Sequence, residues 1–136
     1  MTGKKSGPPA RFKDLCIDAV DIEAAARFWS AALGLGINRP EGEIELVGPS
    51  AEHSIWINQV PEAKTVKNRL HLDLRPRERT RDDELAWLLD QGATQLADHR
   101  REDGGGWVVL ADPEGNEFCI LRSEAEITGL TASPGQ

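Results

Sequence analysis

The second half of this 136-residue chain repeats the layout of its first half. A polar residue opens an apolar stretch in each half, Asp14 in the first and His71 in the second. A helical stretch follows in both halves and stops at a glycine, Gly34 in the first and Gly92 in the second. The separation in sequence between Asp14 and His71 is nearly the same as that between Gly34 and Gly92. A duplicated unit with a polar residue at the same place in each copy predicts a cleft between two similar halves, and clefts hold ligands.

Hydrophobic periodicity predicts the same order of elements in both halves. The first half reads as a strand, a helix and three strands, at 14–20, 22–33, 36–39, 43–48 and 53–59. The second half reads in the same order, at 69–75, 81–91, 94–98, 106–111 and 116–122. Asp21 and Thr80 are typical N-caps for the two helices. The predicted fold is therefore α+β, with two βαβββ modules (12–60 and 68–122) forming a curved mixed sheet with the helices on its outer face.

Composition limits the class of protein. We expect one domain over 12–122, a disordered N-terminal segment over 1–11 and a C-terminal tail over 123–136, because both ends lack periodicity. There is no signal-peptide pattern and no apolar run of membrane-spanning length, and only two cysteines are present. These features favour a cytoplasmic protein without a membrane partner. A net charge of −7 argues against a nucleic-acid partner.

One stretch departs from this acidic balance, because Lys64 to Arg81 is rich in lysine and arginine. It has two interpretations. The stretch is either a solvated loop leading into a helix or a positive rim that attracts an anionic small molecule.

Strand alternation assigns side chains to the two faces of the sheet. Apolar residues such as Leu15, Leu72 and Phe118 suit the face that the helices cover, whereas polar residues alternate with them. In strand 106–111 the alternation is ambiguous, so Trp107 belongs either to the cleft wall or to the core. The residues predicted to bind a ligand are Asp14, Cys16, Trp56, Asn58, His71, Asp73 and Trp107.

Three segments together resemble the vicinal oxygen chelate superfamily. They are Val20-Asp21-Ile22-Glu23, Asn68-Arg69-Leu70-His71-Leu72-Asp73-Leu74 and Asp112-Pro113-Glu114-Gly115-Asn116-Glu117-Phe118. The superfamily includes glyoxalase I, extradiol dioxygenases, fosfomycin resistance proteins and bleomycin-binding proteins. The resemblance covers roughly 12–122 and is closest to the glyoxalase-like branch, which implies the paired-module fold and, by family habit, a homodimer.

The resemblance also implies a metal site built from the first and last strand of each module. Carried over, these positions fall on Asp14, His71, Cys119 and Asn58, with Gln59 in place of Asn58 if a bulge shifts the register. Only His71 keeps the usual ligand type. Asp14, His71 and Cys119 are therefore the predicted ligands of one divalent transition metal ion, and the alternative is a site with no metal. Glu117, two residues from the expected position, is the candidate catalytic base.

Other interpretations of these residues stay open. His71 could be a cleft histidine bonded to Asp73 or Asp14, and Cys119 a buried thiol, a nucleophile or a redox partner of Cys16. Two functions follow. One is a metal-free protein that binds a small molecule and sequesters a toxic or antibiotic compound, and the other is a metal-dependent lyase, isomerase or dioxygenase. Whether the protein is an enzyme stays open.

Overall fold

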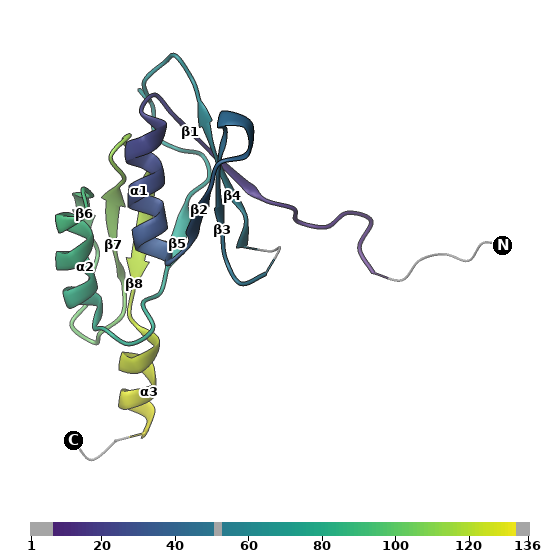
Figure 1. Ribbon diagram of the computed structural model, residues 1–136. Coiled ribbons are helices and arrows are strands. Elements are labelled where there is room, and N and C mark those ends of the chain that lie inside the picture. The colour runs from purple at the N-terminus through teal and green to yellow at the C-terminus, as the bar shows by residue number, and fades with distance from the viewer. Residues whose placement is uncertain (1–6, 51–52, 133–136) are drawn as a thin grey trace.

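The computed structural model describes residues 7–50 and 53–132 (Figure 1). Residues 1–6 of the predicted N-terminal segment and 133–136 of the predicted tail lie outside the described residues. Residues 7–14 contain no helix or strand.

Each half of the chain forms one βαβββ module. The first contains β1 (Leu15–Ala19), α1 (Ile22–Leu33), β2 (Gly36–Asn38), the 3-10 helix η1 (Pro40–Gly42), β3 (Ile44–Val47) and β4 (Ile55–Gln59). The second contains β5 (Leu72–Leu74), α2 (Arg81–Asp90), β6 (Thr94–Asp98), β7 (Trp107–Ala111) and β8 (Glu117–Leu121). The two four-stranded mixed sheets have equivalent orders, β1-β4-β3-β2 and β5-β8-β7-β6. The predicted α+β fold with two βαβββ modules is thereby confirmed.

The predicted caps define where the helices begin and end. The Asp21 carboxylate accepts a hydrogen bond from Ala24 N, and the Thr80 hydroxyl accepts one from Asp83 N, both at 3.1 Å. Gly34 ends α1 in the left-handed conformation, at φ 67°, where a glycine has no Cβ to clash. These local signals explain why α1 has the bounds that the sequence predicts.

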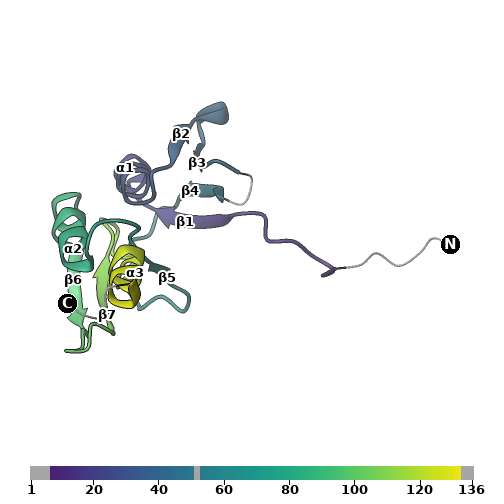
Figure 2. The same cartoon turned by 90° about the horizontal axis from the view of Figure 1, so that it is seen from below.

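Helix α1 joins the two modules. In both views it lies between α2 and the strands β2–β4 (Figures 1 and 2). Its Trp29 ring meets Phe118 of β8 edge-on with a centroid distance of 5.0 Å, and Trp29 Nε1 donates a buried hydrogen bond of 2.8 Å to Asp112 Oδ2. One apolar core therefore serves both modules.

A third helix, α3 (Glu124–Ala132), occupies part of the segment that the sequence presents as a tail. Its start is a capping box, because Glu126 N donates to Ser123 Oγ while Ser123 N donates to a Glu126 carboxylate oxygen. Glu124 N also donates to the carbonyl oxygen of Pro76, at 2.8 Å. Helix α3 lacks a strong apolar stripe, so periodicity gives no sign of it, whereas the Ser123–Glu126 pair is a local signal. Among the described residues no helix has the length and apolar character needed to cross a membrane.

Candidate functional site

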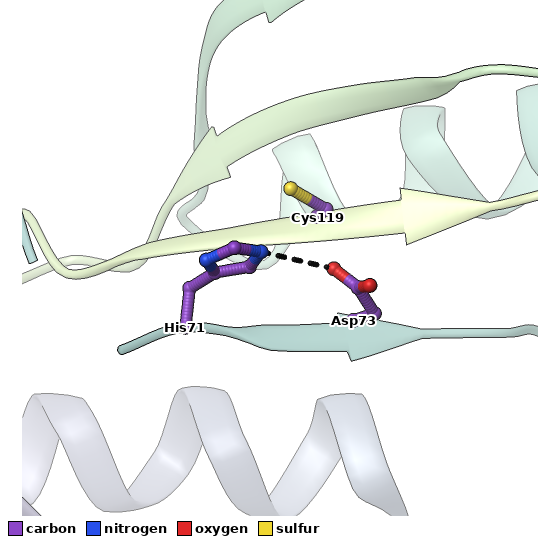
Figure 3. Close-up of side chains that lie close together, drawn as sticks. All are labelled: His71, Asp73 and Cys119. Carbon is purple, nitrogen blue, oxygen red and sulfur yellow. Dashed lines mark ion pairs between the residues drawn. The ribbon is translucent and has the colours of Figure 1, made fainter. Parts of the chain in front are cut away.

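Strands β5 and β8 bring three chemically reactive side chains together. The two strands run parallel, with Asp73 opposite Cys119 in the register. His71 immediately precedes β5, and its side chain points to the same side as that of Asp73 (Figure 3). His71 Nε2 lies 3.3 Å from Asp73 Oδ1, and one nitrogen, oxygen or sulfur atom from each of His71, Asp73 and Cys119 lies within 4.8 Å of the others. We call these three residues the β5–β8 cluster.

The electrostatics of this cluster keep its thiol protonated. The Cys119 side chain is buried, whereas His71 and Asp73 are exposed. Burial raises the pKa of the Cys119 thiol above its ordinary value of 9.0, and the negative charge of Asp73 and its hydrogen bond with the thiol raise it further. Cys119 is therefore a neutral thiol near pH 7 in the absence of a bound cation.

The candidate base Glu117 is fully engaged with the loop before β5. Lys64 Nζ lies 3.0 Å from Glu117 Oε1 and donates to Oε2 at 3.1 Å, while Asn68 N donates to Oε1 at 2.9 Å. Burial raises the pKa of Glu117, but the hydrogen bonds from Asn68 and Lys64 outweigh it, so that the pKa lies below the ordinary 4.5. A carboxylate held in this way is ionised and already has its partners.

Asp14 lies outside the β5–β8 cluster. Its carboxylate pairs with Lys13 Nζ at 2.7 Å and accepts a 3.6 Å hydrogen bond from the exposed Cys16 thiol. The hydrogen bond from Lys13 is the main reason that the pKa of Asp14 lies below its ordinary value. The structure therefore brings together two of the three predicted metal ligands, His71 and Cys119, and adds Asp73.

A cavity of about 400 Å³ lies between β1 and the segment that leads into β5. It contains three predicted site residues, Cys16, His71 and Glu117. Further polar residues that the predicted site lacks also line it: Asp18, Asn68, Arg69 and Asn116. Arg69 alternates with His71 and Asp73 within the predicted strand 69–75, a signal that could have pointed to it, whereas Asn68 precedes that strand and only its closeness to His71 in the sequence points to it.

Three further predicted residues, Trp56, Asn58 and Trp107, do not line this cavity. Trp56 is half-buried beside Cys16 in the pairing of β1 with β4, and Asn58 is exposed. The alternation of β7 is resolved by burial, because Val108 and Leu110 are buried while Trp107 is 39% exposed. Trp107 is thus outside the core, with its ring 5.0 Å from that of His99.

The donor atoms of the β5–β8 cluster suit a divalent transition metal ion. An imidazole nitrogen, a carboxylate oxygen and a thiolate sulfur are the three kinds of donor that zinc accepts, and three protein ligands leave one position of a tetrahedron open. Binding would require Cys119 to lose its proton, which makes the affinity depend on pH.

The fold defines a class of protein, the α+β proteins built of paired βαβββ modules. The family model described as the glyoxalase-like domain matches residues 14–121, and the chain belongs to this family. No curated protein matches the chain in sequence.

Solved structures share the fold at low sequence identity. A glyoxalase/bleomycin resistance protein/dioxygenase family enzyme from Burkholderia phytofirmans is 22% identical, with a TM-score of 0.61 over 82% of this chain and 98% of the other. The fosfomycin resistance protein FosX from Mesorhizobium loti is 14% identical, with a TM-score of 0.63 over 96% and 99%. TnmS3, an antibiotic binding protein from a Streptomyces species, is 17% identical, with a TM-score of 0.61 over 85% and 98%.

Proposed function

We propose that this protein binds a small polar molecule in the 400 Å³ cavity and that binding, rather than proton transfer by Glu117, is its function. The observation that carries the proposal is the engagement of Glu117 by Lys64 and Asn68. A general base has to be free to accept a proton, and its pKa is best placed near the working pH. Glu117 has neither property, so its role is to hold the 64–68 segment against β8.

The cavity has the size and the mixture of groups that small-molecule sites have. Its volume lies within the usual range of about 300–1,000 Å³. Leu15, Ile17 and Phe118 supply apolar surface, while Arg69 and His71 supply donors. FosX is a fosfomycin resistance protein and TnmS3 is an antibiotic binding protein. These likenesses support sequestration of a toxic or antibiotic compound as the use of this cavity. The two free cysteines of the chain, Cys16 and Cys119, support action in the reducing cytoplasm.

A thermal-shift screen with calorimetric confirmation tests the proposal. The probes are fosfomycin, bleomycin and a panel of small aromatic and charged metabolites, each added to the native chain and to Arg69→Gln. The control is Arg27→Gln, which changes an exposed arginine of α1 outside both cavities. We expect a hit to bind the native chain and the control equally and to bind Arg69→Gln about tenfold more weakly, because a charge-assisted hydrogen bond is lost. A compound that binds Arg69→Gln as tightly as the native chain, or the absence of any binding compound, would count against the proposal.

A second candidate function is a metal-dependent lyase, isomerase or dioxygenase, and the geometry of the β5–β8 cluster favours it. A divalent ion held by His71, Asp73 and Cys119 would supply Lewis-acid polarisation of substrate oxygens. Elemental analysis of protein purified from its own host without chelator tests this candidate. About one equivalent of transition metal that is lost in His71→Ala, and kept in the control His53→Ala, would favour the enzyme; a metal-free native protein would favour the binding function.

We further propose that the chain forms a homodimer through the free edges of β1 and β5. β1 and β5 are the edge strands of their sheets, and their free edges offer unpaired backbone groups. Exposed apolar side chains lie beside them: Phe12 is 67% exposed, Val66 76% and Leu70 87%. Such residues beside a strand edge are typical of an interface that a second chain covers.

A further inference from the structure

A second and larger cavity, of about 800 Å³, lies between the modules. Its apolar lining comes from both modules: Leu15, Leu33, Leu35, Leu72, Leu74 and Ile120. It shares only Leu15 and Leu72 with the smaller cavity. The large apolar area indicates a ligand with a hydrocarbon or aromatic body.

The polar rim of this cavity comes from the basic stretch of the sequence. Arg75, Arg77 and Arg79 all line it. Arg75 Nη1 donates to the carbonyl oxygen of Arg122, and Arg79 Nε donates to Glu84 at 2.7 Å while its guanidinium lies 4.5 Å from the Trp87 ring centroid. Among the described residues none forms a hydrogen bond or ion pair with the guanidinium of Arg77. Arg77 is therefore the arginine of the rim that is free to bind an anion.

Acidic residues also line this cavity, and Asp73, Glu78 and Glu84 match the three arginines in number. Glu84 pairs with Arg79, and Asp73 lies 3.3 Å from His71 at its nearest oxygen, so neither carboxylate is a partner of Arg77. Glu78 is exposed beside Arg77, and His53 on the opposite wall has its Nδ1 2.7 Å from Ser50 Oγ. Because a guanidinium binds a carboxylate with two parallel hydrogen bonds, an unpartnered Arg77 above an apolar floor favours a carboxylate head group.

Helix α3 fixes the backbone of this rim. Besides the bond to Pro76, Ala125 N donates to the carbonyl oxygen of Arg77 at 2.9 Å, and a carboxylate oxygen of Glu126 accepts from Arg81 N at 2.8 Å. These contacts come from residues beyond the 14–121 segment that matches the family model. An anchored rim lowers the entropy lost when a ligand is ordered there.

We propose that the larger cavity is a second binding site and that it takes an amphipathic carboxylate. The apolar body lies on the leucine floor, and the carboxylate binds the guanidinium of Arg77. This site is separate from the smaller cavity, so the proposal stands whether or not the smaller cavity binds the compounds considered above.

Calorimetric titration with decanoate tests the proposal, with decanol and decyltrimethylammonium as uncharged and cationic probes of the same chain length. We expect decanoate to bind the native chain more tightly than either control probe. Arg77→Gln should weaken decanoate binding at least tenfold, because the charged bidentate pair with the carboxylate is lost, whereas Arg69→Gln, at the smaller cavity, should leave decanoate binding unchanged. Methyl NMR spectra should show decanoate shifting the resonances of Leu33 and Leu74.

Several results would overturn the proposal. They are the absence of decanoate binding, equal binding of decanol, an affinity that Arg77→Gln leaves unchanged, and a loss of affinity in Arg69→Gln instead. If decanoate binds only a monomeric variant such as Leu70→Glu and not the native chain, the cavity is covered by a second copy and is not a ligand site.

Discussion

At the scale of single residues, the two cysteines have opposite surroundings. Cys16 is exposed beside Asp14, whereas Cys119 is buried next to Asp73, and its burial, followed by the charge of Asp73, raises the pKa of its thiol. The thiolate is the reactive form of cysteine, so burial first and the neighbouring carboxylate second suppress the reactivity of Cys119. The same carboxylate would become a partner of any cation that binds the cluster.

This leads to a prediction on Asp73→Asn in a Cys16→Ser background. Removing the negative charge lowers the pKa of Cys119 and raises its thiolate fraction at pH 8, so alkylation by iodoacetamide should be about threefold faster or more. Mass spectrometry of the alkylated protein gives the rate. Asp18→Asn, an exposed aspartate of β1, is the matched control. An unchanged rate in Asp73→Asn would mean that burial alone protects the thiol.

The sequence predicts part of this site for clear physical reasons. Alternation predicts the faces of Asp73 in β5 and Cys119 in β8 from local pattern, and the parallel pairing of the two strands places them opposite each other. His71 precedes β5, so alternation does not account for its place in the cluster. The partners of Glu117 could not be predicted, because Lys64 and Asn68 lie about fifty residues earlier in the sequence, within a segment without periodicity. The limit is different for Asp14, because Lys13 is its neighbour in the sequence and their pairing depends on side-chain orientation just before β1, which the sequence pattern does not give.

At the scale of elements, capping residues predict the ends of a helix better than hydrophobic periodicity predicts the ends of a strand. Helix α1 has the predicted bounds because Asp21 and Gly34 mark both ends. Strand β5 covers only Leu72–Leu74 and is shorter than the predicted 69–75. Leu70 alternates with Leu72 and Leu74 in the sequence, but it lies outside the strand and is 87% exposed. Alternation assigns a side chain to one face only where the residue belongs to a strand, and residues 69–71 do not belong to one.

Helix α3 provides a prediction on pH. Burial raises the pKa of Glu126, but its hydrogen bonds from Ser123 and Arg81 outweigh this, so the pKa lies below the ordinary 4.5. A depressed native pKa stabilises the fold above pH 4.5, and this stabilisation is lost as the pH falls through the native pKa. Glu126→Gln should therefore lose about 1 kcal/mol at pH 7 and much less at low pH. Urea unfolding at pH 7 and pH 3 measures both values.

Glu124→Gln is the control for that experiment, because Glu124 is an exposed glutamate in the first turn of the same helix. Hydrogen exchange should show faster exchange in α3 and at residues 76–81 in Glu126→Gln only. If the two variants behave alike at both pH values, the Glu126 carboxylate does not anchor the helix.

At the scale of the whole molecule, the turn before β8 couples the modules. The Glu114 carboxylate accepts hydrogen bonds from Val20 N at 2.7 Å and Asp21 N at 3.2 Å, at the start of α1. Two further bonds inside the turn, from Glu114 N and Asn116 N to Asp112 Oδ1, hold this carboxylate in place. The second module therefore caps the helix of the first, with a negative charge at its positive N-terminus.

We expect Glu114→Ala to lower the free energy of unfolding by about 1–2 kcal/mol, because two backbone donors lose their partner. Thermal and urea denaturation measure the loss. Glu102→Ala, an exposed glutamate of the β6–β7 loop, should change stability by less than about 0.5 kcal/mol. Equal losses in the two variants would argue that the cap between modules contributes nothing.

The proposed dimer gives the last prediction, because both cavities lie where β1 and β5 leave their edges free. Light scattering of the native chain should give a mass of about twice 14.9 kDa, and Leu70→Glu should give 14.9 kDa, because a carboxylate placed beside these edges would be buried in the interface without a partner. Leu96→Glu changes a leucine that is 52% exposed on β6, at the opposite edge of the second sheet, and should leave the dimer intact. A monomeric native chain, or a dimer that only Leu96→Glu disrupts, would show that β1 and β5 do not form the interface.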